Sequence, residues 1–181
     1  MKSFAIVSVI FFAACLCPRL DAQEFEIPAM QHLKDAETIR AAHLSVAETK
    51  EILDQVESTS FDVPESWGTE LRVRRQQIGG TEGLIIQATK GLCGATGNCQ
   101  TWAFRRSAGK WLAMFEKQAP IVSGYAFGQQ RDHGIEDFIG AEHISAEISS
   151  YAVFTFDGKF YRLTECYQRD GDNPVKKVPC G

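Results

Sequence analysis

The feature that most constrains the fold is a series of short alternating segments separated by glycine-containing turns. Leu71 and Val73 alternate with arginines, and Gly79-Gly80 separates them from a second alternating stretch at 84–88. Alternation over four to eight residues is typical of strands that bury one face, and glycine permits the positive φ of tight turns. Most of the chain therefore predicts antiparallel β structure.

A later pair of segments gives the strongest hairpin signal. Residues 151–156 and 159–163 flank the dipeptide Asp157-Gly158. This dipeptide suits a two-residue type I′ turn, in which both central residues have positive φ. In total the pattern predicts about eight strands, most of them in hairpins. The expected class is α+β, mainly antiparallel β in a sandwich or half-barrel, with a short N-terminal helical segment.

The helical segment carries its own start signal. Ser45-Val46-Ala47-Glu48 matches the capping box, which predicts a helix from Ser45 to about Glu57. The preceding stretch 29–43 also has apolar residues at helical spacing, and it could continue into this helix with a bend. We therefore divide the chain into a leader and helical segment at 23–62 and an antiparallel β domain at 63–181.

The first 22 residues resemble an export signal. Lys2 precedes the apolar run 4–16, and a polar stretch leads to a suitable cleavage point before Gln23. The run is shorter than the about 20 residues that a transmembrane helix needs. A lipoprotein signal with Cys15 as the lipidated residue is the less favoured alternative. No other stretch approaches transmembrane length, so we expect a periplasmic or secreted protein.

Two of the six cysteines lie in this signal segment. The four that follow are Cys93, Cys99, Cys166 and Cys180. Four cysteines in an exported chain indicate two disulfides, and three pairings are open. We favour the two local pairs, because each closes a short loop rich in Gly, Asn or Pro. A zinc site is the alternative, although the spacings match no usual finger or ribbon.

The charge of the chain excludes a class of partner. The net charge is −4 at pH 7, which lacks the basic footprint of a nucleic-acid-binding protein. The one basic cluster is Arg72, Arg74 and Arg75, and its alternating context predicts a solvated strand face. We therefore expect no nucleic-acid partner.

The densest polar cluster covers residues 131–137, and His143 follows ten residues after His133. The main prediction for this cluster is a solvated loop with a turn at Gly134. Carboxylates beside histidine also suggest a cation site or an acid–base pair. The candidate metal ligands are Asp132, Glu136 and Asp137. No nucleophile elbow or phosphate-binding glycine motif occurs, so we predict no cofactor and a non-catalytic domain.

Several large aromatic residues admit two interpretations. Aromatic residues that alternate in strands are usually core or cross-strand pairs, and a solvent-facing row would instead suggest a carbohydrate or peptide groove. The residues concerned are Trp67, Trp102, Trp111, Tyr125, Tyr151 and Tyr161.

One local motif carries a resemblance. The run from Cys93 to Trp102 reads CGATGNCQTW, Phe104 follows it, and Phe156-Asp157-Gly158 comes later. The stretch 45–166 resembles a group of small exported bacterial proteins of unassigned function with a CGxxGNCxxWxF motif and a C-terminal FDG hairpin. The resemblance implies a bacterial origin and a periplasmic or secreted location, and it supplies no catalytic residues.

These observations lead to one main functional expectation and two alternatives. We expect an exported, non-catalytic β domain that binds a protein or glycan ligand at the cell envelope. The first alternative is an inhibitor of a cell-wall-degrading hydrolase such as lysozyme. The second is a hydrolase or metal-dependent enzyme that uses the region from Asp132 to His143.

Overall fold

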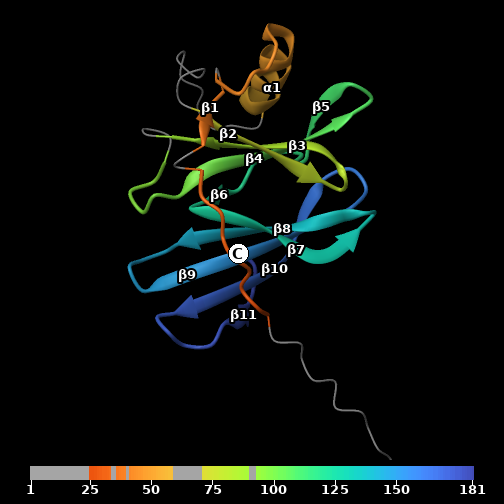
Figure 1. Cartoon of the computed structure of the whole chain (residues 1–181). Coiled ribbons are helices and arrows are strands. Elements are labelled where there is room, and N and C mark those ends of the chain that lie inside the picture. Colours follow the sequence, from red (N-terminus) through yellow and green to blue (C-terminus); the bar gives the residue numbers. More distant parts are fainter. Residues whose placement is uncertain (1–24, 34–35, 40, 59–70, 90–92) are drawn as a thin grey trace, which may run out of the picture.

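The computed structural model describes residues 25–33, 36–39, 41–58, 71–89 and 93–181. Two antiparallel sheets are stacked on each other, and a single described helix lies on the outer side of the first sheet (Figure 1). The predicted α+β class with mainly antiparallel strands is confirmed. The expected export signal at 1–22 and Trp67 lie outside the described residues. Within the described ranges, no helix has the length and apolar character needed to cross a membrane.

The first sheet has the order β1-β2-β3-β4-β5, and β6 pairs separately with β4. Its strands are β1 (Glu37–Thr38), β2 (Leu71–Ile78), β3 (Thr81–Ala88), β4 (Cys99–Ser107), β5 (Lys110–Ala113) and β6 (Ile121–Val122). The second sheet has the order β11-β10-β9-β8-β7. Its strands are β7 (Gly124–Asp132), β8 (Ile135–His143), β9 (Ile148–Phe156), β10 (Tyr161–Asp170) and β11 (Lys176–Val178). In the described part of the chain, eight strands have four or more residues, in agreement with the prediction. Only the short strands β1, β6 and β11 are additional.

Three hairpins turn on two residues that both have positive φ. These residues are Gly79-Gly80 (56° and 73°), Ala108-Gly109 (49° and 81°) and His133-Gly134 (51° and 76°). Paired positive φ values match the type I′ geometry that suits the twist of antiparallel strands. The predicted turn at Gly134 is therefore confirmed.

The predicted two-residue turn at Asp157-Gly158 is wrong, although the hairpin itself is present. Phe156 pairs with Tyr161, so four residues connect β9 to β10, and only Gly158 has positive φ (99°). The Asp157 carboxylate accepts hydrogen bonds from the backbone N–H groups of Lys159 (2.8 Å) and Phe160 (2.7 Å). Because the side chain captures these two amides, the connection is longer than a type I′ turn.

The helix α1 (Val46–Ser58) begins at its predicted capping box. The Ser45 N–H donates to Glu48 Oε2 at 2.9 Å, and the Glu48 N–H donates to Ser45 Oγ at 3.2 Å. Ile52 and Val56 are buried and pack the helix on its own domain.

The stretch 29–43 is not helical in its described residues, contrary to its apolar spacing. Gln31 forms a β-bridge with Tyr125, and Glu37–Thr38 pairs with β2. Two exposed strand edges offer backbone partners here, so pairing with them overrides a weak local helical pattern. His32 and His43 consequently lie in extended and turn segments.

The three arginines of the basic cluster bind this N-terminal segment. The prediction of a solvated strand face is therefore wrong for their guanidinium groups. Each guanidinium group donates to a backbone carbonyl: Arg72 to Ala36 (3.1 Å), Arg74 to His32 (2.9 Å) and Arg75 to Ala42 (2.8 Å). The arginines therefore hold this segment against β2, at the edge of the first sheet.

The aromatic residues form the core. Phe115, which follows β5, contacts Phe138 and Tyr161 of the second sheet at ring-centroid distances of 5.4 and 5.5 Å. The buried candidates from the sequence are Trp102, Trp111, Tyr125, Tyr151 and Tyr161, at most 4% exposed. A solvent-facing row of these described aromatic residues is therefore excluded.

Both favoured disulfides are present. Cys93 pairs with Cys99 in the connection that leads to β4, and Cys166 of β10 pairs with Cys180 after β11. The zinc alternative is excluded for these four residues because their sulfur atoms are bonded in pairs.

Candidate functional site

The polar cluster at 131–137 forms the tip of the β7–β8 hairpin. This tip packs against the β2–β3 turn, where a Cβ added to Gly79 would lie 2.7 Å from Ile135 Cγ1. The His133 ring lies beside Gly158 of the β9–β10 connection. Three turns therefore meet at one end of the sandwich, on the right of Figure 1. The cluster is partly packed, although His133 and Gly134 themselves are exposed.

Glu136 links the elements at this end. Its carboxylate forms an ion pair with Arg131 (2.6 Å) and accepts the Gly79 N–H (2.9 Å). Its backbone carbonyl accepts a hydrogen bond from the Tyr161 hydroxyl at 2.8 Å. Burial raises the pKa of Tyr161, and the nearby negative charges of Glu136 and Asp137 raise it further. The contacts of Glu136 are those of a residue that stabilises the fold.

Asp137 is the buried carboxyl of the cluster. It is 6% exposed, and no hydrogen bond to its Oδ1 atom is found in the described part of the chain. Burial raises the pKa of Asp137, the carboxylates of Asp132 and Glu165 raise it as well, and the Thr155 hydroxyl opposes them. Glu136 and Asp137 are neighbours in a strand, so their side chains project from opposite faces.

The three candidate ligands are not brought together as a metal site. Throughout the described ranges, no group of three or more His, Cys, Asp or Glu side chains is placed to hold a metal ion. His133 and His143 lie at opposite ends of β8, since one precedes the strand and the other ends it. The structure therefore does not pair these histidines as an acid and a base.

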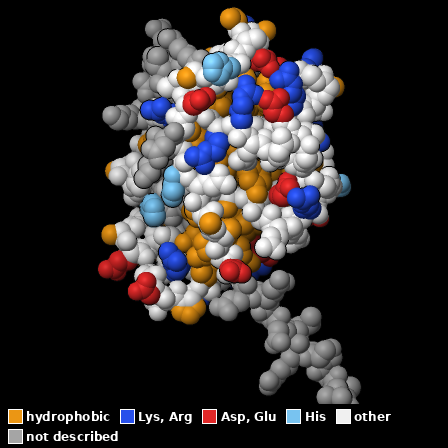
Figure 2. All heavy atoms as spheres, viewed as in Figure 1, with side chains coloured by type: hydrophobic (Ala, Val, Ile, Leu, Met, Phe, Trp, Pro, Cys, Tyr) orange, Lys and Arg blue, Asp and Glu red, His pale blue; other side chains and the backbone are white. Residues whose placement is uncertain are grey.

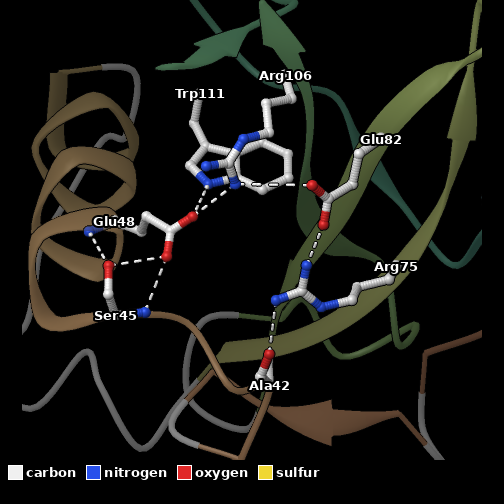
Figure 3. A network of polar contacts seen from close by, with 7 residues as sticks. All are labelled: Ala42, Ser45, Glu48, Arg75, Glu82, Arg106 and Trp111. Atoms are coloured by element: carbon white, nitrogen blue, oxygen red, sulfur yellow. Dashed lines mark hydrogen bonds and ion pairs between the residues drawn. The ribbon is translucent and has the colours of Figure 1, made fainter. Parts of the chain in front are cut away.

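A second polar network joins α1 to the first sheet (Figure 3). Glu48 Oε1 accepts hydrogen bonds from Arg106 Nη1 (2.6 Å) and Trp111 Nε1 (3.3 Å). Hydrogen bonds from the Ser45 backbone, the Ser45 hydroxyl and Arg106 lower the pKa of Glu48 to about 2. The Arg106 guanidinium also lies 5.1 Å from the Trp111 ring centroid.

The same network extends along the first sheet. Arg106 contacts Glu82 at 3.6 Å, and Glu82 forms an ion pair with Arg75. Sequence reasoning missed the tertiary half of this network. The capping box located Glu48, and only cross-strand pairing places Arg106 beside Trp111. These charges are matched and hold the helix, so the network offers no free group for chemistry.

The opposite end of the sandwich carries the loop closed by Cys93 and Cys99, which we call the disulfide loop (residues 94–98). The Asn98 side chain donates to the His143 carbonyl (2.8 Å) and accepts the His143 N–H (3.0 Å). The buried Asn98 thus fixes the loop to the end of β8, and residues 94–97 stay exposed.

Two exposed isoleucines flank the disulfide loop. Ile144 directly follows His143 and is 52% exposed, and Ile121 of β6 is 43% exposed. Strand β6 pairs with Cys99 and Gln100 immediately after the loop and also contacts β8. The loop and the β8–β9 connection lie on the left of Figure 1. Sequence reasoning missed this surface, because β6 is too short to show a pattern.

Two cavities among the described residues border the N-terminal segment. The first, of about 320 Å³, lies between β2 and the N-terminal segment, and its arginines already bind backbone carbonyls of that segment. The second, of about 500 Å³, lies between residues 25–27 and residues 169–175. Figure 2 shows hydrophobic side chains gathered over the second sheet, on the face seen in Figure 1.

Comparison of the chain with protein-family models, curated proteins and solved structures found no match.

Proposed function

We propose that the protein is an exported, non-catalytic β domain that binds a ligand at the cell envelope, with the disulfide loop as its contact surface for a protein partner. The two disulfides fit an extracellular or periplasmic location, where thiols are oxidised. Export through the segment 1–22 and a bacterial origin belong to this proposal.

The observation that carries the proposal is a rigid loop beside exposed apolar side chains. A disulfide and the Asn98 contacts hold the loop in one conformation, so binding would require little further ordering. Ile121 and Ile144 supply apolar surface of the kind that a protein partner buries at the centre of an interface.

The test is a site-specific cross-link followed by an affinity measurement. A photo-reactive residue replaces Ala95 in the full chain, and the partner that it captures in envelope fractions is purified. We expect the double variant Ile121→Ser/Ile144→Ser to bind this partner at least ~10-fold more weakly. Val46→Ser is the matched control, because Val46 is 90% exposed and lies at the start of α1. Equal affinities for wild type and the double variant would contradict the proposal.

One candidate protein partner is a cell-wall-degrading hydrolase that this protein inhibits. This case can be tested directly, because the activity of the hydrolase can be measured. Lysozyme activity would fall on titration with the wild-type protein, and the Ile121→Ser/Ile144→Ser variant would lose this effect.

A hydrolase in which Asp137 acts is the remaining candidate, favoured by the raised pKa of this buried carboxyl. In that case, Asp137→Ala and His133→Ala would each abolish a measurable hydrolysis.

A further inference from the structure

We propose that the second cavity is a binding site for a short saccharide; we call it the N-terminal groove. It has a volume of about 500 Å³, which lies within the range of ligand pockets. One wall is the segment 25–27, and the other is the end of β10 with the β10–β11 loop. The site is separate from the disulfide loop and goes beyond the protein-binding function proposed above.

The first wall includes the aromatic ring of Phe25, which a second ring supports on one face. The Phe25 ring stacks on the Tyr167 ring with centroids 3.9 Å apart and an interplanar angle of 10°. Tyr167 is itself fixed, because its hydroxyl donates to Glu165, which also accepts from Lys177 Nζ at 2.6 Å. Phe25 thus lines the groove as a preset surface.

The opposite wall is a constrained loop. Cys166–Cys180 closes the segment that contains it, and β11 pairs with β10. The Gly171 N–H donates to the Glu147 carbonyl (2.8 Å), and the Asn173 N–H donates to the Asp170 carbonyl (3.0 Å). The loop therefore needs little reorganisation to receive a ligand.

The polar side chains of the groove are planar groups with unused bonding capacity. Arg169 and Asp172 line it, and neither side chain has a hydrogen-bond or ion-pair partner among the residues that the structure describes. A guanidinium and a carboxylate can each bond two neighbouring hydroxyl groups. Asn173 adds a carboxamide to the lining, and its Nδ2 already donates to the Asp170 carbonyl at 2.8 Å.

The lining as a whole fits a neutral polyhydroxylated ligand. Phe25, Ile27, Pro174 and Val175 offer apolar surface to the C–H face of a sugar ring. Glu26 and Asp172 oppose Arg169 in charge, so the groove has no strong positive field for a phosphate or nucleic acid. A saccharide combines the apolar faces and the vicinal hydroxyls that this lining matches.

The experiment is calorimetric titration of the full chain with tetra-N-acetylchitotetraose, cellotetraose and a peptidoglycan-derived disaccharide. We expect at least one of them to bind, and Asp172→Ala to weaken that binding ~10-fold, because a charged hydrogen bond is lost. Phe25→Ala should weaken it to a similar degree, and Phe25→Tyr should retain it. Asp170→Ala is the matched control, since Asp170 is an exposed carboxylate two residues away that does not line the groove.

Each outcome decides the assignment. Circular dichroism first establishes whether each variant folds. If Phe25→Ala does not fold, Asp172→Ala by itself tests the proposal. Saccharide binding that Asp172→Ala and Phe25→Ala reduce and Asp170→Ala leaves intact supports the groove. The proposal is overturned if none of the three saccharides binds at millimolar concentration, or if the variants bind as wild type does. Neither result alters the disulfide-loop test, which uses different residues.

Discussion

The outer faces of the two sheets are covered in different ways. On the first sheet, α1 buries Ile52 and Val56, and Glu48 receives hydrogen bonds from Ser45, Arg106 and Trp111 (Figure 3). On the second sheet, a short extended segment contributes Phe25, which stacks on Tyr167. Asp137, on a strand of this second sheet, has an Oδ1 atom for which the described residues supply no hydrogen-bond donor.

The difference shows how a covering element sets the charge state of a carboxyl group. Donors from a helix start and from the sheet favour ionised Glu48, whose pKa falls to about 2. Burial without enough donors favours the protonated form of Asp137, whose pKa rises. The two groups therefore give the stability of the protein opposite dependences on pH.

The largest expected effect is on the helix-covered face. Trp111→Ala removes a fully buried ring and the indole donor to Glu48, so we expect it to lower the free energy of unfolding by about 3–5 kcal/mol. Tyr151→Ala on the second sheet should lower it by less, because the ring is smaller and its hydroxyl has no hydrogen-bond partner among the described residues. Urea denaturation measures both values. An equal or larger loss for Tyr151→Ala would show that the two faces are covered equally well.

The second effect concerns the covalent links. Replacing Cys166 and Cys180 by Ser opens a loop with a sequence separation of 14, and replacing Cys93 and Cys99 opens one with a separation of 6. Chain entropy predicts losses of about 3 and about 2 kcal/mol, so the disulfide of the second sheet matters more. Thermal unfolding of the two double variants measures the order, and the reverse order would disprove it.

A smaller effect is expected at Glu48. Glu48→Ala removes the capping box and should lower the free energy of unfolding by about 1–2 kcal/mol at pH 7. The folded pKa of about 2 lies below the ordinary value of 4.5, so the Glu48 contribution is present above pH 4.5 and is lost between 4.5 and about 2. Urea denaturation at a series of pH values measures this. The free energy of unfolding should change less with pH over this range for Glu48→Gln than for wild type.

The exposed Glu57 near the end of the same helix is the control for Glu48. Glu57→Ala should change the free energy of unfolding by less than about 0.5 kcal/mol. Because alanine has a higher helix propensity than glutamate, propensity cannot cause a loss at either position. A loss at Glu57 that equals the loss at Glu48 would mean that the contacts of Glu48 with Ser45, Arg106 and Trp111 do not explain the effect.

The smallest expected effect is a gain at Asp137. Asp137→Asn replaces a buried carboxyl group by a neutral amide and should raise the free energy of unfolding by about 1 kcal/mol at pH 7. The wild-type contribution is full below the ordinary pKa of 3.8 and is lost as pH rises through the raised folded value. Thermal unfolding from pH 3 to 8 measures this. Wild type should lose stability as the pH rises through the pKa of Asp137, and Asp137→Asn should not show this loss. Glu142→Gln, at an exposed position of the same strand, is the control, and an equal gain there would contradict a specific role for burial of Asp137.

The predictable features are those in which neighbouring residues satisfy one another. The capping box places Ser45 and Glu48 within one turn, so the start of α1 is readable from four residues. The two local disulfides and the alternation of buried and exposed positions also depend on residues that are close together in the sequence. At Asp157 the same local logic failed, because its carboxylate bound the amides of Lys159 and Phe160 and lengthened the turn.

The candidate sites depended on contacts that a linear pattern does not contain. Residues 131–137 predicted a solvated loop, and the structure packs their hairpin against two other turns. The N-terminal groove joins residues 25–27 to residues 169–175, which are remote in sequence. Neither the groove nor the surface at Ile121 and Ile144 has a periodic signal.

The sequence by itself determined the strand alternation and the start of the helix, and it favoured the two disulfide pairings that are present, because each depends on side chains close together in the chain. Only the tertiary structure decided that the described residues of 29–43 are extended or in turns, that the arginines of β2 bind this segment, and that Asp137 is buried. These outcomes depend on which strand edges and faces remain unpaired after the sheets form. Burial and edge pairing are properties of the assembled fold, so they override local propensity where that propensity is weak.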